Sequence, residues 1–117
     1  MDLESSVAKH GEWKMKLRGA INRQETLDAT SIGSDHRCEL GQWLHGDARK
    51  QYGSLKSYAT CVARHAEFHA EAGKVAKAIN AKRFGEAETM IGAGSAYAQA
   101  SSAASVAILA LKKEARM

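Results

Sequence analysis

The sequence predicts an all-α protein, an up-down four-helix bundle with a short additional helix in the connection between the first and third helices. Three observations support this fold class. The chain contains no proline, and long stretches are rich in Ala, Lys, Glu, Gln and Met, which favour helices. Apolar residues recur at helical spacing, and the alternation typical of strands is nearly absent. A length of 117 residues is enough for one core, so we expect a single domain over residues 1–117.

We expect the first helix over Leu3–Leu27, because one face of this segment is largely apolar. That face is formed by five residues at helical spacing, namely Leu3, Val7, His10, Leu17 and Ile21. His10 takes a place where an apolar residue would be expected. Residues 28–35 (DATSIGSD) are expected to form a polar loop, in which Ser34 or Asp35 caps a short second helix.

The second helix is expected to run through Leu44, because the sequence His45-Gly46-Asp47 then interrupts it. The third helix is expected over about Leu55–Asn80, after a glycine and a serine. Its apolar face consists of Leu55, Tyr58, Val62, His65, His69, Ala72, Ala76 and Ile79. The fourth helix is expected from about Phe84 to the C-terminus, and it is rich in Ala, Ser and Gly.

Composition argues against several classes of function. No apolar stretch approaches the 18 residues of a membrane span, and charges occur throughout the first 20 residues, so we expect neither membrane contact nor a signal peptide. Two cysteines do not make a disulfide scaffold, which favours a reducing, cytoplasmic location. The net charge of +4 is spread among interleaved acidic and basic residues, so nucleic-acid binding is not expected.

Three histidines lie within the apolar faces of two predicted helices. His65 and His69 are four residues apart, so both rings can reach one metal ion, although the surrounding sequence is not the His-Glu-x-x-His motif of zinc proteases. A buried histidine without a partner costs about 1–3 kcal/mol, and a metal shared with His10 would satisfy all three rings. Cys38, near the start of the second helix, is the candidate fourth ligand, and the helix N-terminus would favour its thiolate. The alternative is three satisfied core histidines and an inert thiol.

The order and spacing of three motifs resemble the chemoreceptor zinc-binding (CZB) domain family. These motifs are His10-Gly-Glu-Trp13, Cys38-Glu-Leu-Gly-Gln-Trp43-Leu and His65-Ala-Glu-Phe-His69. The resemblance extends from about residue 8 to residue 112. It implies a zinc ion held by His10, Cys38, His65 and His69, whereas His36 is not at a ligand position of the family.

The same resemblance implies a cytoplasmic bacterial regulatory domain, usually a homodimer, attached to a chemoreceptor or a diguanylate cyclase. Zinc would join the helices that carry its ligands, so zinc occupancy would be coupled to the output of the effector. Oxidation of the thiolate of Cys38 would be a second input, because an oxidised sulfur ligates zinc poorly. Small residues at positions 92–98 also favour a homodimer through the first and last helices.

Other residues and other functions compete with this interpretation. Cys61 lies four residues before His65 and is a rival ligand, but a buried apolar role is favoured. Trp13 and Trp43 are expected to pack around the metal site, and His45 is expected in an exposed loop. The alternative functions are a hemerythrin-like di-iron oxygen-binding bundle and a metal-free helical dimerisation module. An enzyme is not expected, because four protein ligands leave no open position on zinc.

Overall fold

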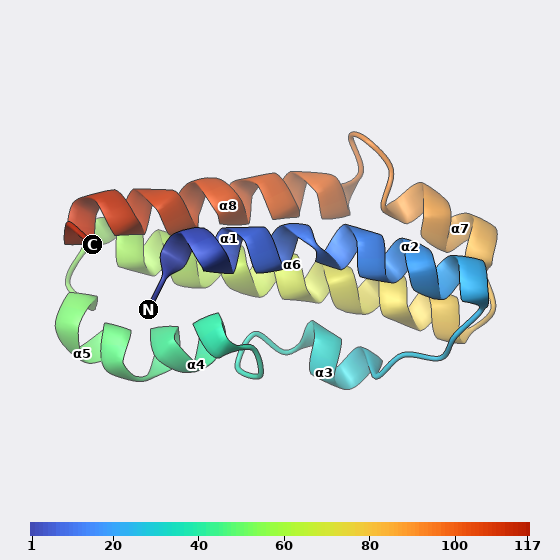
Figure 1. Cartoon of the computed structure of the whole chain (residues 1–117), viewed down its shortest axis with the longest axis horizontal. Helices are drawn as coiled ribbons and strands as arrows, with labels where there is room; N and C mark the ends of the chain where they lie inside the picture. Colours follow the sequence, from blue (N-terminus) through green and yellow to red (C-terminus); the bar gives the residue numbers. More distant parts are fainter.

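The computed structural model describes all residues of the chain, 1–117, and contains only helices and connecting turns (Figure 1). The helices in chain order are α1 (Leu3–Gly11), α2 (Trp13–Arg23), α3 (Ala29–Gly33), α4 (Glu39–His45), α5 (Asp47–Tyr52), α6 (Lys56–Asn80), α7 (Phe84–Met90) and α8 (Ala96–Ala115). The all-α prediction is therefore confirmed. No helix is long and apolar enough to span a bilayer.

The long helices α6 and α8 pack against each other, and α1 and α2 lie along them with α1 against α8 and α2 against α6 and α7. The three short helices α3, α4 and α5 follow one another along the side of α6 that faces away from α8, and α3 and α4 both contact α6 (Figure 1). Both chain termini lie at the same end of the elongated molecule, next to α5 (Figure 1). This arrangement brings α1, the start of α4 and the middle of α6 to one place.

The predicted first helix is interrupted at Glu12, and it ends at Arg23 rather than Leu27. Hydrogen bonds across Glu12 keep α1 and α2 nearly continuous, because its N–H donates to Ala8 and its carbonyl accepts from Lys16. The end is sharp because Gln24 adopts the left-handed conformation with φ 56°. The predicted third helix is confirmed almost to the residue by α6.

The connection between the first and third long helices is more helical than predicted. The expected polar loop contains α3, which Asp28 caps by accepting a hydrogen bond from the N–H of Ser31 at 3.1 Å. The second predicted helix begins at Glu39 with Cys38 as its N-cap, so the prediction of a cap at Ser34 or Asp35 was wrong. Helix α5 was not predicted, because its residues show no clear apolar face.

The predicted fourth helix is broken between α7 and α8. Gly94 adopts φ 76° in this turn, a conformation that glycine reaches without strain, and Ser95 then caps α8 by accepting from the N–H of Ala98. The small-residue segment 92–98 is therefore partly a turn and not the middle of a helix. This weakens its use as an argument for close helix packing between two chains.

The apolar core consists of two separate clusters. The first contains Leu17, Phe68, Val75, Ile79 and Tyr97 among other residues, and the second contains residues such as Leu3, Leu44, Cys61, Ile108 and Leu111. Both α6 and α8 contribute to both clusters. Three buried histidines lie on α1 and α6 in the region where one cluster gives way to the other.

Candidate metal centre

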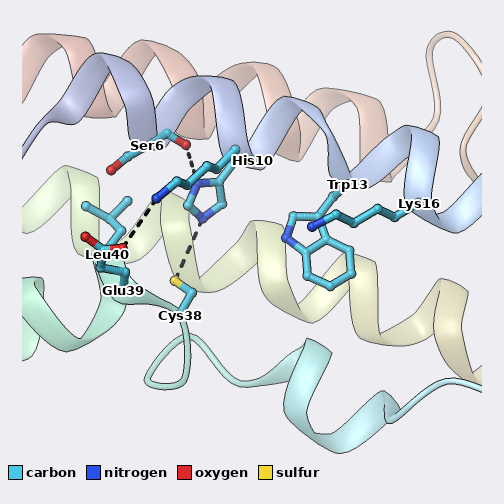
Figure 2. Close-up of a pocket in the computed structure, with 8 residues that line it drawn as sticks. Ser6, His10, Trp13, Lys16, Cys38, Glu39 and Leu40 are labelled. Carbon is cyan, nitrogen blue, oxygen red and sulfur yellow. Dashed lines mark hydrogen bonds and ion pairs between the residues drawn. The ribbon is translucent and has the colours of Figure 1, made fainter.

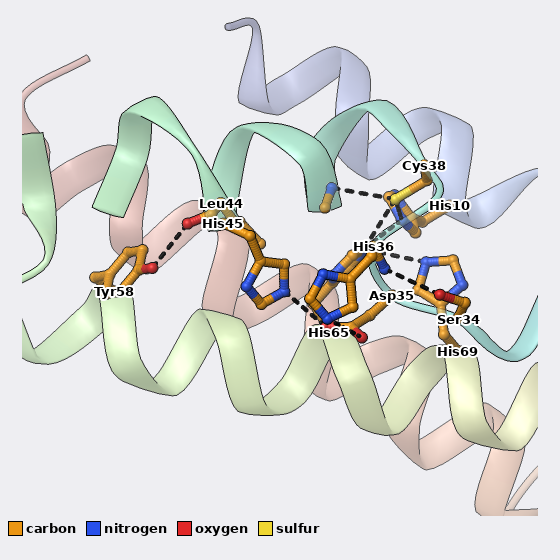
Figure 3. Close-up of polar contacts among 11 residues, drawn as sticks. His10, Ser34, Asp35, His36, Cys38, Leu44, His45, Tyr58, His65 and His69 are labelled. Atoms are coloured by element: carbon orange, nitrogen blue, oxygen red, sulfur yellow. Dashed lines mark hydrogen bonds and ion pairs between the residues drawn. The ribbon is translucent and has the colours of Figure 1, made fainter. Parts of the chain in front are cut away.

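The structure brings the four predicted ligand residues together. Their donor atoms all lie within 4.8 Å of one another, although the residues come from three segments far apart in the chain. His10 is in the last turn of α1, Cys38 is the N-cap of α4, and two turns of α6 supply the other two histidines. The three imidazoles are buried, and the thiol is half-buried. Figure 2 shows His10 next to Cys38, and Figure 3 shows these two side chains together with His65 and His69.

The Nε2 atoms of the three histidines and the sulfur of Cys38 point to a common centre. The Nε2 atom of His65 lies 3.2 Å from that of His10 and 3.1 Å from that of His69. The Sγ atom of Cys38 lies 3.2 Å from Nε2 of His65 and 3.9 Å from Nε2 of His10. Bond lengths of about 2.05 Å to nitrogen and 2.3 Å to sulfur place tetrahedral zinc ligands about 3.3 Å (N–N) and 3.6 Å (N–S) apart. The observed spacings are those of a zinc site within a few tenths of an ångström.

Hydrogen bonds on the far side of two rings determine which nitrogen faces this centre. The Nδ1–H of His10 donates to the carbonyl of Ser6 at 2.7 Å, and the Nδ1–H of His69 donates to the carbonyl of Ile32 at 2.8 Å. In the neutral rings both Nε2 atoms are then acceptors. A single proton on Nε2 of His65 can satisfy only one of them, whereas a cation at the centre satisfies all the lone pairs.

The environment keeps the three imidazoles uncharged. Burial, together with the smaller effect of the neighbouring rings of His69 and His10, lowers the pKa of His65 to about 3. Burial also lowers the pKa of His10 and His69, against the opposing effect of their backbone hydrogen bonds. Neutral imidazoles are the form that ligates metals, so near pH 7 no proton has to leave these rings first.

The pKa of the Cys38 thiol differs from the sequence-based expectation, which was that the helix N-terminus favours the thiolate. Burial raises its pKa, and this outweighs the backbone N–H groups of Gly41 and Leu40, which favour the thiolate. The N–H of Gly41 donates to the sulfur at 3.3 Å, as expected for a helix N-cap. The helix N-terminus alone therefore does not give a thiolate here, and a cation at the centre is needed to stabilise it.

A comparison with known protein families gives one match, to the chemoreceptor zinc-binding domain, over residues 10–76. The matched segment is more than half of the chain and contains all four donor residues. The chain belongs to the chemoreceptor zinc-binding domain family. No curated protein and no solved structure gave a match. The match is narrower than the span of the motif resemblance, because it ends within α6 and leaves out α7 and α8.

The family is a sensory zinc-binding module and not a catalytic domain. Zinc binding is consistent with the four donor residues that the structure brings together. Three imidazoles and one thiolate are a complete tetrahedral shell for zinc. The set contains no carboxylate, whereas a di-iron site in a helical bundle relies on several carboxylates.

A small cavity of about 180 Å³ opens beside the donor cluster of this zinc-binding domain (Figure 2). It is lined by Ser6, Lys9, His10, Trp13, Lys16, Cys38, Glu39 and Leu40. Trp13 therefore lies in the same cavity wall as His10 and Cys38, and Lys16 lies over its ring at 4.9 Å from the centroid. The cavity gives a solvent path towards His10 and Cys38, whereas His65 and His69 do not line it.

Two other predicted neighbours, Trp43 and Cys61, belong to the second apolar cluster. Trp43 packs on the second apolar cluster, with its ring centroid 6.1 Å from that of Tyr52. Cys61 is fully buried in the same cluster, and burial raises the pKa of its thiol to about 11. Its sulfur is not among the converging donor atoms, which agrees with the interpretation as a buried apolar residue.

Sequence reasoning missed the outer contacts of the centre. The carbonyls of Ser6 and Ile32 carry no sequence signal, because any residue has a carbonyl. Close packing of the 34–38 loop on α4 also went unpredicted: a Cβ at Gly41 would lie 1.6 Å from the carbonyl oxygen of Asp35. The expectation that His45 is an exposed loop residue was wrong, since it ends α4, is partly buried and bonds Asp35 at 2.9 Å.

Proposed function

We propose that this chain is the zinc-binding sensory domain of a bacterial signalling protein, a chemoreceptor or a diguanylate cyclase. In this proposal one zinc ion is held by His10, Cys38, His65 and His69. The observation that carries it is the convergence of three Nε2 atoms and one Sγ atom at the spacings of a tetrahedral zinc shell. Membership of a zinc-binding sensory family supports the same conclusion.

The chemistry of the site suggests how occupancy becomes a signal. Bound zinc would supply the positive charge that three lone pairs and a thiolate require. The residues that hold it belong to α1, α4 and α6, so loading fixes these elements to one another. Without a cation, the facing Nε2 lone pairs of His10 and His69 cannot both be satisfied, and this favours opening of the cluster. The domain is then stiffer when loaded and looser when empty, and an attached effector responds to the difference.

Oxidation of Cys38 is the second proposed input. The cavity beside the sulfur is small and is flanked by Lys9 and Lys16, so a small oxidant reaches the sulfur more easily than a bulky reagent does. Hypochlorous acid, for example, transfers one oxygen atom to the thiolate, which becomes a sulfenate, while the chlorine is reduced to chloride. The oxidised sulfur binds zinc poorly, and the link between α1 and α6 is weakened.

The proposal also covers assembly and location. We treat α1–α2, the α3–α5 run, α6 and α7–α8 as the four members of an up-down bundle that functions as a homodimer in the cytoplasm. Exposed apolar side chains on α8 support the dimer, because Val106 is 68% exposed and Leu109 is 45% exposed. The effector would belong to the same, longer protein as this domain. We do not expect the domain to contact nucleic acid or membrane.

Metal analysis of the protein purified without added metal tests the function. The proposal expects close to one zinc per chain. About two iron ions per chain would instead support the di-iron alternative, and no metal would support the metal-free dimerisation module.

Substitution tests the ligand assignment. His69→Ala removes one ligand and should remove most of the bound zinc, with a lower melting temperature. Glu67→Gln is the matched control on the same helix, because Glu67 is exposed and pairs with Arg64 away from the cluster. The control should keep its zinc. Unchanged zinc content in variants at two of the four ligand positions would refute the assignment.

A further inference from the structure

A second group of metal-ligating side chains lies next to the four-donor centre and takes no part in it. Asp35, His36 and His45 each offer one donor atom, and these three atoms lie within 4.8 Å of one another. The Nε2 atom of His45 is 2.9 Å from Oδ2 of Asp35, and the Nε2 atom of His36 is 3.7 Å from Oδ1. Figure 3 shows both rings turned towards this carboxylate.

The three residues come from two places that the fold holds together. Asp35 and His36 are in the loop before α4, and His45 is the last residue of α4. The loop is pressed against α4, because the backbone of Asp35 fills the space where Gly41 lacks a side chain. The positions of the carboxylate and the His45 ring are therefore fixed by the backbone and do not depend on a chance surface contact.

This group differs from the buried centre in its access to water. The side chain of Asp35 is 18% exposed, that of His45 is 29% exposed, and that of His36 is 66% exposed. Two imidazoles and one carboxylate provide three ligands, and solvent can fill the remaining positions of an ion. Such sets suit zinc and other borderline divalent ions such as Cu²⁺ and Ni²⁺, and they leave the ion exchangeable.

The present arrangement shows what has to change when an ion binds. The rings of His36 and His45 are stacked, with centroids 3.9 Å apart and an angle of 19° between their planes. Two ligands of one ion diverge from it, so stacked rings cannot both point at the same centre. The exposed ring of His36 has room to leave the stack, while the ion takes the place of the hydrogen bond between Asp35 and His45.

We propose that Asp35, His36 and His45 form a second, solvent-accessible site for a divalent transition-metal ion, loaded at higher free metal than the buried centre. Its ion is exchangeable because water completes the shell. The ion would tie the loop that carries Cys38 to the far end of α4. The second site uses none of the four residues of the proposed zinc centre, so the two assignments stand or fall separately.

The test is a zinc titration of the full chain. Protein stripped with a chelator and reloaded with one zinc equivalent is dialysed against increasing free Zn²⁺, and bound zinc is measured by mass spectrometry. The wild type should take up a second equivalent. His36→Ala and His45→Gln should each weaken that second step by about tenfold or more, since even the loss of an outer partner of a metal ligand has an effect of this size. Asp47→Asn, which removes an exposed carboxylate two residues after His45, is the matched control and should bind two ions.

Further variants separate this site from the buried one. His69→Ala should lose the first ion and keep the second, which shows that the second step does not depend on the proposed zinc centre. His36→Ala decides the matter if His45→Gln disturbs α4, because the His36 ring is largely exposed. The proposal is overturned if the wild type still binds only one zinc per chain when free Zn²⁺ is raised to about 100 μM, about 100-fold above a micromolar dissociation constant. It is also overturned if the His36→Ala/His45→Gln double variant still binds two ions with unchanged affinity.

Discussion

Gly73→Ala tests whether the approach of α3 to α6 controls the metal centre. A Cβ at Gly73 would lie 2.9 Å from Cα of Gly33, a distance at which backbone has to move. The moving segment is α3, which carries Ile32, and the carbonyl of Ile32 accepts the Nδ1–H of His69 at 2.8 Å. The substitution therefore acts on a ligand histidine through its outer hydrogen bond, without touching any donor atom.

The expected changes in stability and in zinc affinity follow from three effects: overpacking, the gain from replacing a helical glycine, and weakening of the hydrogen bond from His69. Overpacking of this kind costs about 1–3 kcal/mol of folding free energy, and replacing a helical glycine by alanine returns about 0.5–1 kcal/mol. We expect a net destabilisation of about 1 kcal/mol, within the range of those two effects. Weakening the outer hydrogen bond of a metal-bound histidine lowers metal affinity by about 10–100-fold. A loss of this size is about 1.4–2.7 kcal/mol of binding free energy, so zinc binding should lose more free energy than the folding of the zinc-free chain does.

The assay compares Gly73→Ala with Gly85→Ala, whose added Cβ meets no atom within 4 Å. Zinc affinity is measured by competition with a chromogenic chelator, and stability by urea unfolding of the chelator-treated protein. Gly85→Ala should leave zinc affinity unchanged. If the two variants have the same zinc affinity, the hydrogen bond from His69 to the α3 backbone does not support the metal centre and the reasoning is wrong.

Three more predictions concern pH, the thiols and assembly. In the zinc-free protein, burial lowers the pKa of His10, His65 and His69 below the value in the unfolded chain, so the unfolded chain takes up protons first as the pH falls. The free energy of unfolding of the zinc-free protein should therefore be highest above about pH 6.5 and should decrease towards pH 3, by up to about 1.4 kcal/mol per pH unit for each such histidine. Urea unfolding in the presence of chelator measures this free energy, and a constant value from pH 7 to 5 would contradict the prediction. Titration with hypochlorous acid should oxidise Cys38 and release zinc while Cys61 stays reduced, and mass mapping that finds oxidised Cys61 with zinc retained would refute the redox proposal. Leu109→Glu should convert the dimer to a monomer in light scattering at tens of micromolar, whereas a wild-type monomer at that concentration would count against the dimer.

Sequence patterns predicted the long helices and the four donors because these depend on side-chain identity. The apolar face of α6 and its two histidines have a helical period, so that helix and the ligand pair could be read directly. The break at Glu12 has no comparable signal, because it depends on backbone conformation and packing. The break between α7 and α8 coincides with Gly92, Gly94 and the cap at Ser95, a turn signal that was interpreted only as a run of small residues. Helix α3 was missed since its five residues are stabilised by the cap at Asp28 and by contact with α6.

The parts of the site that the sequence did not reveal are contacts between segments. The carbonyl partners of His10 and His69 are backbone atoms, and only the fold determines which carbonyl each ring meets. The effect of burial on Cys38 was also missed, because the helix N-terminus is visible in the sequence and the depth of the thiol is not. The pairing of Asp35 with His45 depends on how the loop before α4 folds back on that helix.

The division of the core into two apolar clusters has a consequence for how the chain unfolds. Side chains of one cluster do not pack directly into the other, and the histidines occupy the region between them. Helices α6, α8 and the nearly continuous α1–α2 therefore join two apolar clusters that are packed separately. A metal ion at the junction would couple the two clusters, so we expect the loaded molecule to unfold in a steeper transition than the stripped one. The ion would thus make the unfolding of the two apolar clusters more cooperative.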